Sequence, residues 1–289
     1  MILVTGAAGF IGRNVVAKLV EDHDVKGMVY DPDDMDVVEE LGGEPVRGDI
    51  TDPATLAGKL DDVDVVVHLV GIIQGSQDDF RKIHVDGTQH LLDEADDLDQ
   101  FIYISALGAE NASTPYFETK IKAEERVKGS GHPYTIFRPS VVFGEDDSFV
   151  NLLIDQIEDA PVAPVLGSGD YRLQPLYVKD LAAIIDQAIG NKDALNDTFE
   201  VGGPGIVSLE HLIDIILEKK GWDRRKVHIP MVLARLGAPW ARRVMDVPLS
   251  KTTLTMLKEE NYVKEHHYTD IFDVKLHSIE DLFTKIYGD

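Results

Sequence analysis

Short apolar runs alternate with amphipathic stretches along the first half of the chain. The apolar runs predict strands at 2–5, 25–30, 45–47, 63–70, 101–105 and 134–138. The amphipathic stretches predict helices at 10–20, 78–97 and 115–128, and a further helix opening at 51–53, where a capping residue precedes a proline. Strands separated by helices predict an α/β fold built on a doubly wound parallel sheet.

The alternation weakens after Gly144. Short segments there carry prolines and glycines, one helix is predicted at 178–189, and the pattern beyond 202–205 is mostly helical. Neither an internal repeat nor a low-complexity linker separates the two halves. We therefore predict a doubly wound domain from residues 1–143 plus about 172–200, and a smaller, mostly helical cap from about 144–171 plus 201–289.

The segment 6–12, between the first strand and the first helix, reads Gly-Ala-Ala-Gly-Phe-Ile-Gly. Its glycines permit a tight turn and a close approach of backbone N–H groups to a pyrophosphate, and the helix N-terminus adds a favourable partial charge. A purely structural turn has the same spacing, but this position is typical of a Rossmann dinucleotide-binding domain. We predict cofactor contacts from Gly6, Ala8, Gly9, Phe10, Ile11 and Gly12.

Asp31 ends the second predicted strand, 19 residues past Gly12. A carboxylate at this place accepts hydrogen bonds from an adenosine ribose diol and repels a 2′-phosphate, which favours NAD(H). Arg13 could reach such a phosphate, so NADP(H) stays open. Asp49, after the third strand, would lie at the edge of the adenine or cap a turn. The alternative for Asp31 is a solvated loop acid, one of several in this segment.

Tyr116 and Lys120 are four residues apart on a predicted helix and therefore share one face. An ammonium lowers the pKa of a neighbouring phenol, which suits the phenol to general acid–base chemistry near neutral pH. Ser105 ends the preceding strand, where ligands bind in such sheets, and could polarise a substrate carbonyl or simply make a local cap. We take these three residues as the candidate catalytic set.

Several motifs together resemble those of the extended and atypical short-chain dehydrogenase/reductases. They are the glycine loop at 6–12, HLVGII at 68–73, HVDGT at 84–88, SALGA at 105–109, Tyr-x-x-x-Lys at 116–120, RPSVVFG at 138–144 and QPLYVKD at 174–180. The combination is similar to the branch that includes the NAD(P)H-binding accessory subunit of respiratory complex I. This likeness extends from Met1 to about residue 220.

The resemblance implies a bound nicotinamide nucleotide, with the glycine loop, Asp31 and Asp49 on its adenosine side. Many relatives have an arginine where Tyr30 stands, which suits a 2′-phosphate, so Tyr30 favours NAD(H) here. The complex I subunit is regarded as holding its nucleotide structurally, so the resemblance leaves enzymatic activity open. Further implied cofactor contacts are Ile50, Leu69, Val70, Gly71, Lys120, Pro139, Ser140 and Val141.

Three functions remain under consideration. The first is an NAD(P)-dependent oxidoreductase with Tyr116 as the acid or base and Lys120 and Ser105 assisting, on an unidentified small carbonyl, hydroxyl or quinone substrate. The second is a non-catalytic, nucleotide-holding accessory or assembly protein. The third is a nucleotide-sugar epimerase or dehydratase. The third is disfavoured because Ser105 precedes Tyr116 by only 11 residues, a shorter gap than such epimerases usually show, and their Ser/Thr pair is absent.

The overall charge excludes some partners. The formal net charge is −24, with 34 Asp and 18 Glu, and a surface so negative repels nucleic acid. An acidic excess of this kind suggests a salt-loving source, although 17 Lys against 11 Arg argues the other way. The chain has no Cys, no apolar run of membrane-spanning length and no visible secretory signal. We expect a soluble, cytoplasmic protein.

Residues 219–243 break the acidic pattern with eight basic residues and one acid. This basic window could bind an anionic membrane surface or a partner subunit, line a cleft for a phosphorylated substrate, or pair internally with surrounding acids. A peripheral location at the inner face of the membrane is therefore included in the expectation. No metal site is assigned, because His68, His84 and the His266-His267 pair form no ligand pattern and are expected to be packed or surface imidazoles.

Overall fold

The computed structural model describes residues 1–111, 114–232, 261–264 and 267–288. Its contacts divide the chain into two compact units. The first unit comprises Met1–Pro139, Val178–Val201 and Glu265–Lys275, and the second comprises Ser140–Tyr177, Gly202–Lys264 and Leu276–Asp289. The first segment of the first unit ends at Pro139, and the second unit begins at Ser140. The segments 172–177 and 265–275 fall in the opposite units from those expected.

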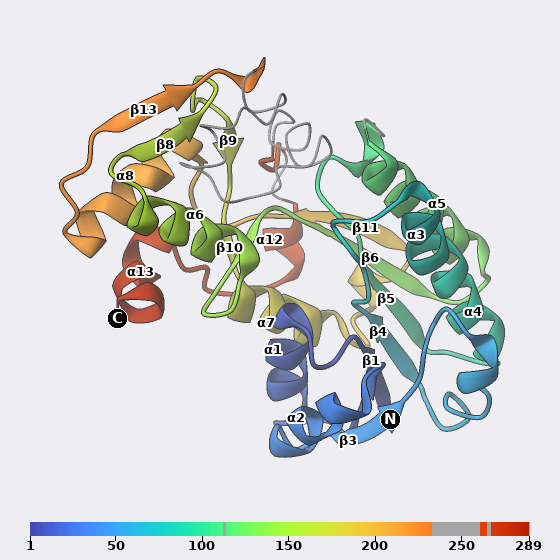
Figure 1. The fold of residues 1–289 in the computed structure, drawn as a ribbon. Coiled ribbons are helices and arrows are strands. Elements are labelled where there is room, and N and C mark those ends of the chain that lie inside the picture. The colour runs from blue at the N-terminus through green and yellow to red at the C-terminus, as the bar shows by residue number, and fades with distance from the viewer. Residues whose placement is uncertain (112–113, 233–260, 265–266, 289) are drawn as a thin grey trace. The chain divides into compact units, whose positions relative to one another are not determined.

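The first unit is built on a parallel sheet, as the strand–helix alternation predicts. Its described residues form a seven-stranded sheet in the order β11-β6-β5-β4-β1-β2-β3 (Figure 1). Every neighbouring pair is parallel. The strands are β1 Ile2–Thr5, β2 Val25–Val29, β3 Glu44–Arg47, β4 Val65–His68, β5 Gln100–Ile104, β6 Tyr134–Pro139 and β11 Asp197–Val201. The predicted doubly wound sheet is confirmed, and β11 is a strand that the sequence pattern did not reveal.

Helices cover both faces of this sheet (Figure 1). α1 (Phe10–Leu19) and α7 (Val178–Ala188) pack together on one face, and α3 (Gln77–Phe80), α4 (Gly87–Glu94) and α5 (Pro115–Gly129) lie on the other. A π-helical turn at Arg81–Asp86 joins α3 to α4, and a short α2 (Met35–Glu40) precedes β3. The core under α4 and α5 includes Leu91, Phe101, Tyr103, Ala123 and Val127.

The helix predicted to open at 51–53 is wrong. Asp52 does cap a turn, because its carboxylate accepts a hydrogen bond from the N–H of Ala54. The structure then forms only a 3₁₀ turn at Pro53–Thr55, followed by non-helical turns. Gly58 there adopts a φ of +71°, a conformation that an α-helix does not contain. The capping signal therefore began a turn and not a helix.

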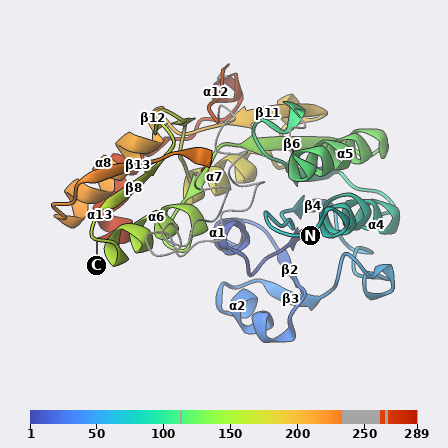
Figure 2. The ribbon, with the colours of Figure 1, turned by 45° about the horizontal axis from the view of Figure 1, so that its top comes forward.

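The second unit has its own apolar core, formed by helices and short strands. The helices of its described residues are α6 (Ser148–Asp159), α8 (Leu209–Lys220) and α13 (Ile279–Tyr287), so the expected helical C-terminal portion is confirmed. Its described residues also form three two-stranded sheets. Two of them pair β7 (Val142–Phe143) with β10 (Leu176–Tyr177) and β9 (Arg172–Leu173) with β12 (Val207–Ser208). The third pairs β8 (Ala163–Leu166) with β13 (Lys226–Ile229), which lie side by side in Figure 2.

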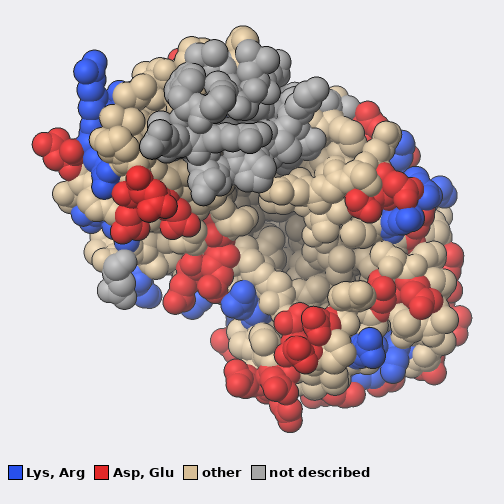
Figure 3. Space-filling model, viewed as in Figure 1, with Lys and Arg blue, Asp and Glu red and all other residues tan. Residues whose placement is uncertain are grey.

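Charge is distributed over the surface of both units. In Figure 3, Asp and Glu side chains form several separate groups on the face in view, with Lys and Arg side chains between them. Among the helices that the structure describes, none is both long and apolar enough to span a membrane. The described residues contain no group of three or more His, Asp or Glu side chains arranged to hold a metal ion.

Candidate active site

The glycine loop joins β1 to α1 with the close backbone packing that its sequence predicts. Gly6 has a φ of +70°, and its carbonyl accepts a hydrogen bond from the N–H of Gly9 at 3.0 Å. A Cβ placed on Gly12 would lie 2.0 Å from the Gly6 carbonyl oxygen, so only glycine fits there. No side chain caps the N-terminus of α1, which leaves backbone N–H groups for an anion such as a pyrophosphate.

A cavity of about 380 Å³ opens beside this loop within the first unit. Of the predicted cofactor contacts, six line it: Gly6, Ala8, Gly9, Asp49, Ile50 and Val70. Other lining residues come from the ends of the neighbouring strands and the segments that follow them, including Met28, Tyr30, Asp34, Thr51, Ile72 and Ile83. Phe10, Ile11 and Gly12 continue from the loop into α1. The cavity therefore adjoins the N-terminal end of α1, where the adenosine half of a dinucleotide is predicted to bind.

Tyr30 and Asp31 directly follow β2. Tyr30 lines the cavity and is 72% exposed, so its ring is free to cover a ligand. Asp31 is exposed, and its Oδ1 accepts a hydrogen bond from the N–H of Asp33 at 3.1 Å. Asp49 likewise accepts hydrogen bonds from the N–H and the hydroxyl of Thr51, at 2.8 and 2.7 Å. Both acids cap turns, and only Asp49 lines the cavity itself.

Tyr116 and Lys120 share the buried face of α5, as their spacing predicts, and are 7% and 4% exposed. Burial raises the pKa of Tyr116 to about 12, opposite in direction to the lowering expected from the nearby ammonium. Burial also lowers the pKa of Lys120 to about 8, against the opposing influence of Glu124. The Nζ of Lys120 donates to the carbonyl of Ile104 at 2.9 Å and lies 5.1 Å from the ring centre of Tyr103.

Gly71 and Leu69, predicted to run along the cofactor, belong to the segment after β4. A Cβ on Gly71 would lie 3.1 Å from the Nζ of Lys120 and 3.4 Å from Nε2 of His84. Glycine therefore allows this loop to approach the ammonium group closely. The neighbouring N–H of Leu69 donates to the hydroxyl of Thr5 at 3.3 Å, which ties the segment to the end of β1.

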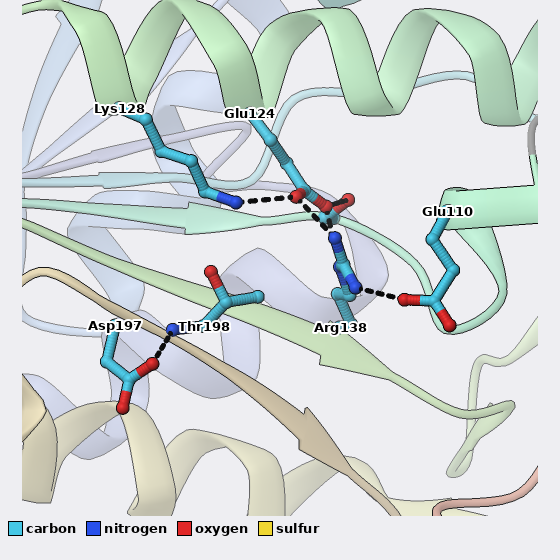
Figure 4. Close-up of polar contacts among 7 residues, drawn as sticks. Glu110, Glu124, Lys128, Arg138, Asp197 and Thr198 are labelled. Atoms are coloured by element: carbon cyan, nitrogen blue, oxygen red, sulfur yellow. Dashed lines mark hydrogen bonds and ion pairs between the residues drawn. The ribbon is translucent and has the colours of Figure 1, made fainter.

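The hydroxyl of Ser105 forms a hydrogen bond within the protein. It donates to Oε1 of Glu124 at 2.6 Å. Glu124 in turn accepts from Nε and Nη2 of Arg138 at 2.9 and 2.8 Å, and Arg138 also binds Glu110 (Figure 4). A serine hydroxyl has one proton to donate, and in this arrangement it is donated to Glu124. The role of Ser105 in polarising a substrate carbonyl stays a prediction. The spacing of four residues from Lys120 places Glu124 on the same buried face of α5, but nothing in the sequence relates it to Ser105.

His68 and His84, which were expected to be packed or surface imidazoles, are both buried and are linked through Thr88. Thr5 bonds to Nδ1 of His68 at 2.7 Å, and Nε2 of His68 bonds to the hydroxyl of Thr88 at 3.0 Å. That hydroxyl donates to the carbonyl of His84 at 2.6 Å. Burial, with a smaller contribution from Lys120, lowers the pKa of each imidazole to about 3, so both are neutral. Sequence reasoning missed the proximity of His84 to the candidate catalytic residues.

Pro139, Ser140 and Val141 fall on both sides of the boundary between the units. Pro139 ends β6, and its carbonyl accepts a hydrogen bond from Leu107 at 3.0 Å. In the second unit, Oδ1 of Asn261 bonds to the hydroxyl of Ser140 at 2.6 Å and to the N–H of Val141 at 2.9 Å. These polar groups of Ser140 and Val141 are engaged within the second unit, and their contact with a cofactor stays a prediction.

The described part of the basic window pairs partly within the second unit. Lys226 forms ion pairs with Glu210 and Asp214 at 2.9 and 2.7 Å. The guanidinium of Arg224 donates to the carbonyls of Glu158 and Ala160. These contacts agree with the alternative of internal pairing for this end of the window. Three of its cations, Arg235, Arg242 and Arg243, lie outside the described residues.

Comparison with known proteins identifies the family of the chain. Residues 2–202 match the model of the NAD dependent epimerase/dehydratase family. The chain is 27% identical over 264 residues to subunit 9 of the NADH dehydrogenase [ubiquinone] 1 alpha subcomplex of Arabidopsis thaliana, covering 85% of this chain and 64% of that protein. It is 28% identical over 187 residues to the ceramide reductase of Caulobacter vibrioides, covering 63% of this chain and 59% of that protein.

The matched regions thus span less than two thirds of the length of both relatives. Among solved structures, an NADPH-dependent quinone oxidoreductase of Escherichia coli in complex with NADPH has the same fold. It superposes with a TM-score of 0.77 at 17% identity, over 99% of this chain and 100% of that one. The family model covers most of the chain, including every strand of the sheet in the first unit. The protein therefore belongs to the NAD dependent epimerase/dehydratase family.

Proposed function

We propose that the protein is an NAD(P)-dependent oxidoreductase that acts on a small carbonyl, hydroxyl or quinone substrate. The observation that carries this proposal is the buried ammonium of Lys120, close to Gly71 and four residues from Tyr116. Burying a cation beside one carbonyl acceptor costs free energy, and a buried ammonium with a strongly perturbed pKa is typical of a functional site. A bound nicotinamide would supply or accept the hydride.

The side chains of this site have distinct tasks in the proposed reaction. Tyr116 keeps its proton at neutral pH, because burial raises its pKa to about 12, and so it donates that proton to a substrate oxygen as the carbonyl is reduced. In the reverse direction it takes the proton back from a hydroxyl. Lys120 supplies a positive charge below about pH 8, which stabilises the tyrosinate left after proton donation.

We infer that NAD(H) is the favoured cofactor. The exposed carboxylate of Asp31 at the end of β2 would accept hydrogen bonds from ribose hydroxyls and repel a 2′-phosphate. Tyr30 brings no positive charge to the cavity that it lines. The glycine loop and the uncapped N-terminus of α1 would hold the pyrophosphate.

The first experiment identifies any nucleotide that co-purifies with the protein and measures its exchange against excess NADH and, separately, NADPH. We expect rapid exchange with a preference for NADH, followed by turnover of carbonyl or quinone substrates that is lost in Tyr116→Phe. A Tyr116→Phe protein with every detectable turnover unchanged would refute the catalytic role. A nucleotide released only on unfolding would favour the second candidate function.

That second candidate is a nucleotide-holding accessory or assembly protein that catalyses nothing. It is favoured by the 27% identity to a subunit of NADH dehydrogenase and by the engagement of the Ser105 proton with Glu124. In this case the basic window would bind a partner subunit or an anionic membrane from the cytoplasmic side. Salt-sensitive binding to anionic vesicles, lost when Arg242 and Arg243 are neutralised, would support it. Lys226→Gln is the matched control, because Lys226 is already paired internally.

A further inference from the structure

His84 lies in the π-helical turn between α3 and α4 and is 1% exposed. Both of its ring nitrogens are hydrogen-bonded: Nε2 to the backbone N–H of Ile72 at 3.0 Å, and Nδ1 to the hydroxyl of Thr119 at 2.9 Å. A backbone N–H only donates, so Nε2 must accept and carries no proton. The proton is therefore on Nδ1, which donates to Thr119, and Thr119 passes a hydrogen bond to the carbonyls of α5.

The two partners of this imidazole belong to different parts of the site. Ile72 lines the cavity beside the glycine loop, whereas Thr119 stands on α5 between Tyr116 and Lys120. The ring of Tyr116 also packs edge-on against His84, with ring centres 5.6 Å apart. One side chain thus contacts the cavity-lining loop and the helix that carries both candidate catalytic residues.

The surroundings of His84 keep it neutral. Desolvation is the largest influence on its pKa, and the charges of Lys120 and His68 act in the same direction. The aromatic rings of Phe80 and Tyr116 also pack against it. A proton on Nε2 would also point at the N–H of Ile72, so protonation would break the link to the loop. π-Helical turns are frequent at functional sites, and here the turn carries this residue.

We propose that His84 is a positioning residue that holds the loop of residues 70–72 against α5 and so sets the dinucleotide relative to Tyr116 and Lys120. This inference rests on the proposed function. It gives His84 a task distinct from that of His68, whose hydrogen bonds join strand ends and α4 without reaching α5.

The test combines a spectroscopic signature with cofactor binding. In ¹⁵N-labelled full-length protein, the His84 imidazole, assigned by its loss in His84→Gln, should be the Nδ1–H tautomer. It should not titrate between about pH 8 and about pH 5.5, where an ordinary histidine gains its proton. An Nε2–H tautomer, or titration in that range, would overturn the proposal.

Binding of NADH is measured on the wild type, His84→Gln, His84→Leu and Gln100→Leu. Gln places an acceptor and a donor near the two ring nitrogens and should bind NADH within about twofold of the wild type, whereas Leu should bind about tenfold more weakly. Gln100 is the matched control, because its buried side chain also forms hydrogen bonds to two different segments, at Thr135 and Ala188. Gln100 is the first residue of β5 and lies at the opposite end of that strand from Ile104, whose carbonyl accepts from Lys120. Gln100→Leu should retain wild-type affinity.

The outcomes separate the two claims. If the wild type binds no dinucleotide, the proposed function fails and the positioning role falls with it. If the wild type binds NADH and His84→Leu binds equally well, only the positioning role fails. Two further outcomes would overturn the positioning role. The first is an equal loss of NADH affinity in His84→Leu and Gln100→Leu, which indicates a general structural effect. The second is a folded His84→Gln protein that binds NADH as weakly as His84→Leu, because the affinity would then not depend on the hydrogen bonds at this position.

Discussion

The hydroxyl of Ser105 donates to Oε1 of Glu124 at 2.6 Å, and the same buried carboxylate binds Arg138 through two hydrogen bonds. This relationship ties the end of β5 to α5 and to β6. A charge-assisted hydrogen bond of this kind contributes to stability, and the engaged proton is not offered to a substrate. The arrangement makes Ser105 a structural partner of Glu124 in this state.

We therefore expect Ser105→Ala to lower the free energy of unfolding by about 1–3 kcal/mol, because a hydrogen bond to a charged group is lost. Cofactor affinity and any turnover should stay near the wild-type values. Urea unfolding and NADH titration measure the two effects. A loss of turnover of more than about tenfold, with affinity intact, would instead place Ser105 at the reacting atoms.

Glu124→Gln should be more damaging than the change of its neighbour. Removing one member of a buried ion pair costs about 3–5 kcal/mol, because the guanidinium of Arg138 keeps its charge. Glu110→Gln is the matched control: it removes a carboxylate from the same arginine, but the Glu110 side chain is 53% exposed against 2% for Glu124. We expect the control to cost less than about 1 kcal/mol in the same urea titration. Equal effects would contradict this ranking.

Gly12→Ala should abolish dinucleotide binding. The added Cβ would meet the Gly6 carbonyl oxygen at 2.0 Å, so the glycine loop or α1 must move. Gly129→Ala is the control, because a Cβ at Gly129 meets nothing within 4 Å. Circular dichroism and NADH titration should show a folded Gly129→Ala protein with wild-type affinity. Wild-type affinity in Gly12→Ala would mean that the loop does not bind the pyrophosphate.

Lys120 should make stability depend on pH in the alkaline range. Its pKa is lowered to about 8 in the folded protein from 10.5, so between these values the unfolded chain binds more protons. The contribution of Lys120 to the free energy of unfolding is therefore smallest below about pH 8 and rises as the pH approaches 10.5. Urea titrations across this range should show the rise in the wild type and lose it in Lys120→Met. An identical dependence of stability on pH in both proteins would contradict a buried Lys120 with a lowered pKa.

Asp31→Asn should shift cofactor preference toward NADPH, because it removes a negative charge from the place where a 2′-phosphate would lie. We expect the ratio of NADPH to NADH affinity to increase about tenfold, equivalent to about 1.4 kcal/mol. Asp36→Asn, which removes an equal charge from an exposed position on α2, should leave the ratio unchanged. If both variants shift the ratio equally, the effect comes from net charge and not from Asp31.

Tyr287→Phe should destabilise the second unit. The Tyr287 hydroxyl donates to Oδ2 of Asp147 and accepts from the N–H of Gly144 at 3.1 Å, and Asp147 also caps α6. Loss of the hydroxyl leaves buried partners short of a hydrogen bond, at a cost of about 1–3 kcal/mol in the free energy of unfolding. Tyr171→Phe is a comparison from the same core, and NADH affinity should be unchanged in both.

The sequence by itself determined the features that depend on short segments. Apolar runs and amphipathic stretches predicted six of the seven strands of the sheet in the first unit and the helical segments that follow β1, β4 and β5, because burial of each element follows its own periodicity. They did not predict α2, and the helix expected to open at 51–53 was wrong. The glycine loop and the face shared by Tyr116 and Lys120 followed from spacing along a turn and along a helix. β11 was missed because three of the five residues of Asp197–Val201 are polar and the strand is exposed at its start, as an edge strand can be.

Only the tertiary structure decided the state of the candidate site. The hydroxyl of Ser105 donates a hydrogen bond to Glu124, which is 19 residues away in the sequence. The imidazole of His84 is hydrogen-bonded to Ile72 and to Thr119, which are 12 and 35 residues away. Burial, which no single segment specifies, raises the pKa of Tyr116 and lowers that of Lys120. Hydrogen bonds and desolvation depend on atoms brought together from distant segments, so residue type and spacing alone could identify the catalytic candidates but not their charge or their partners.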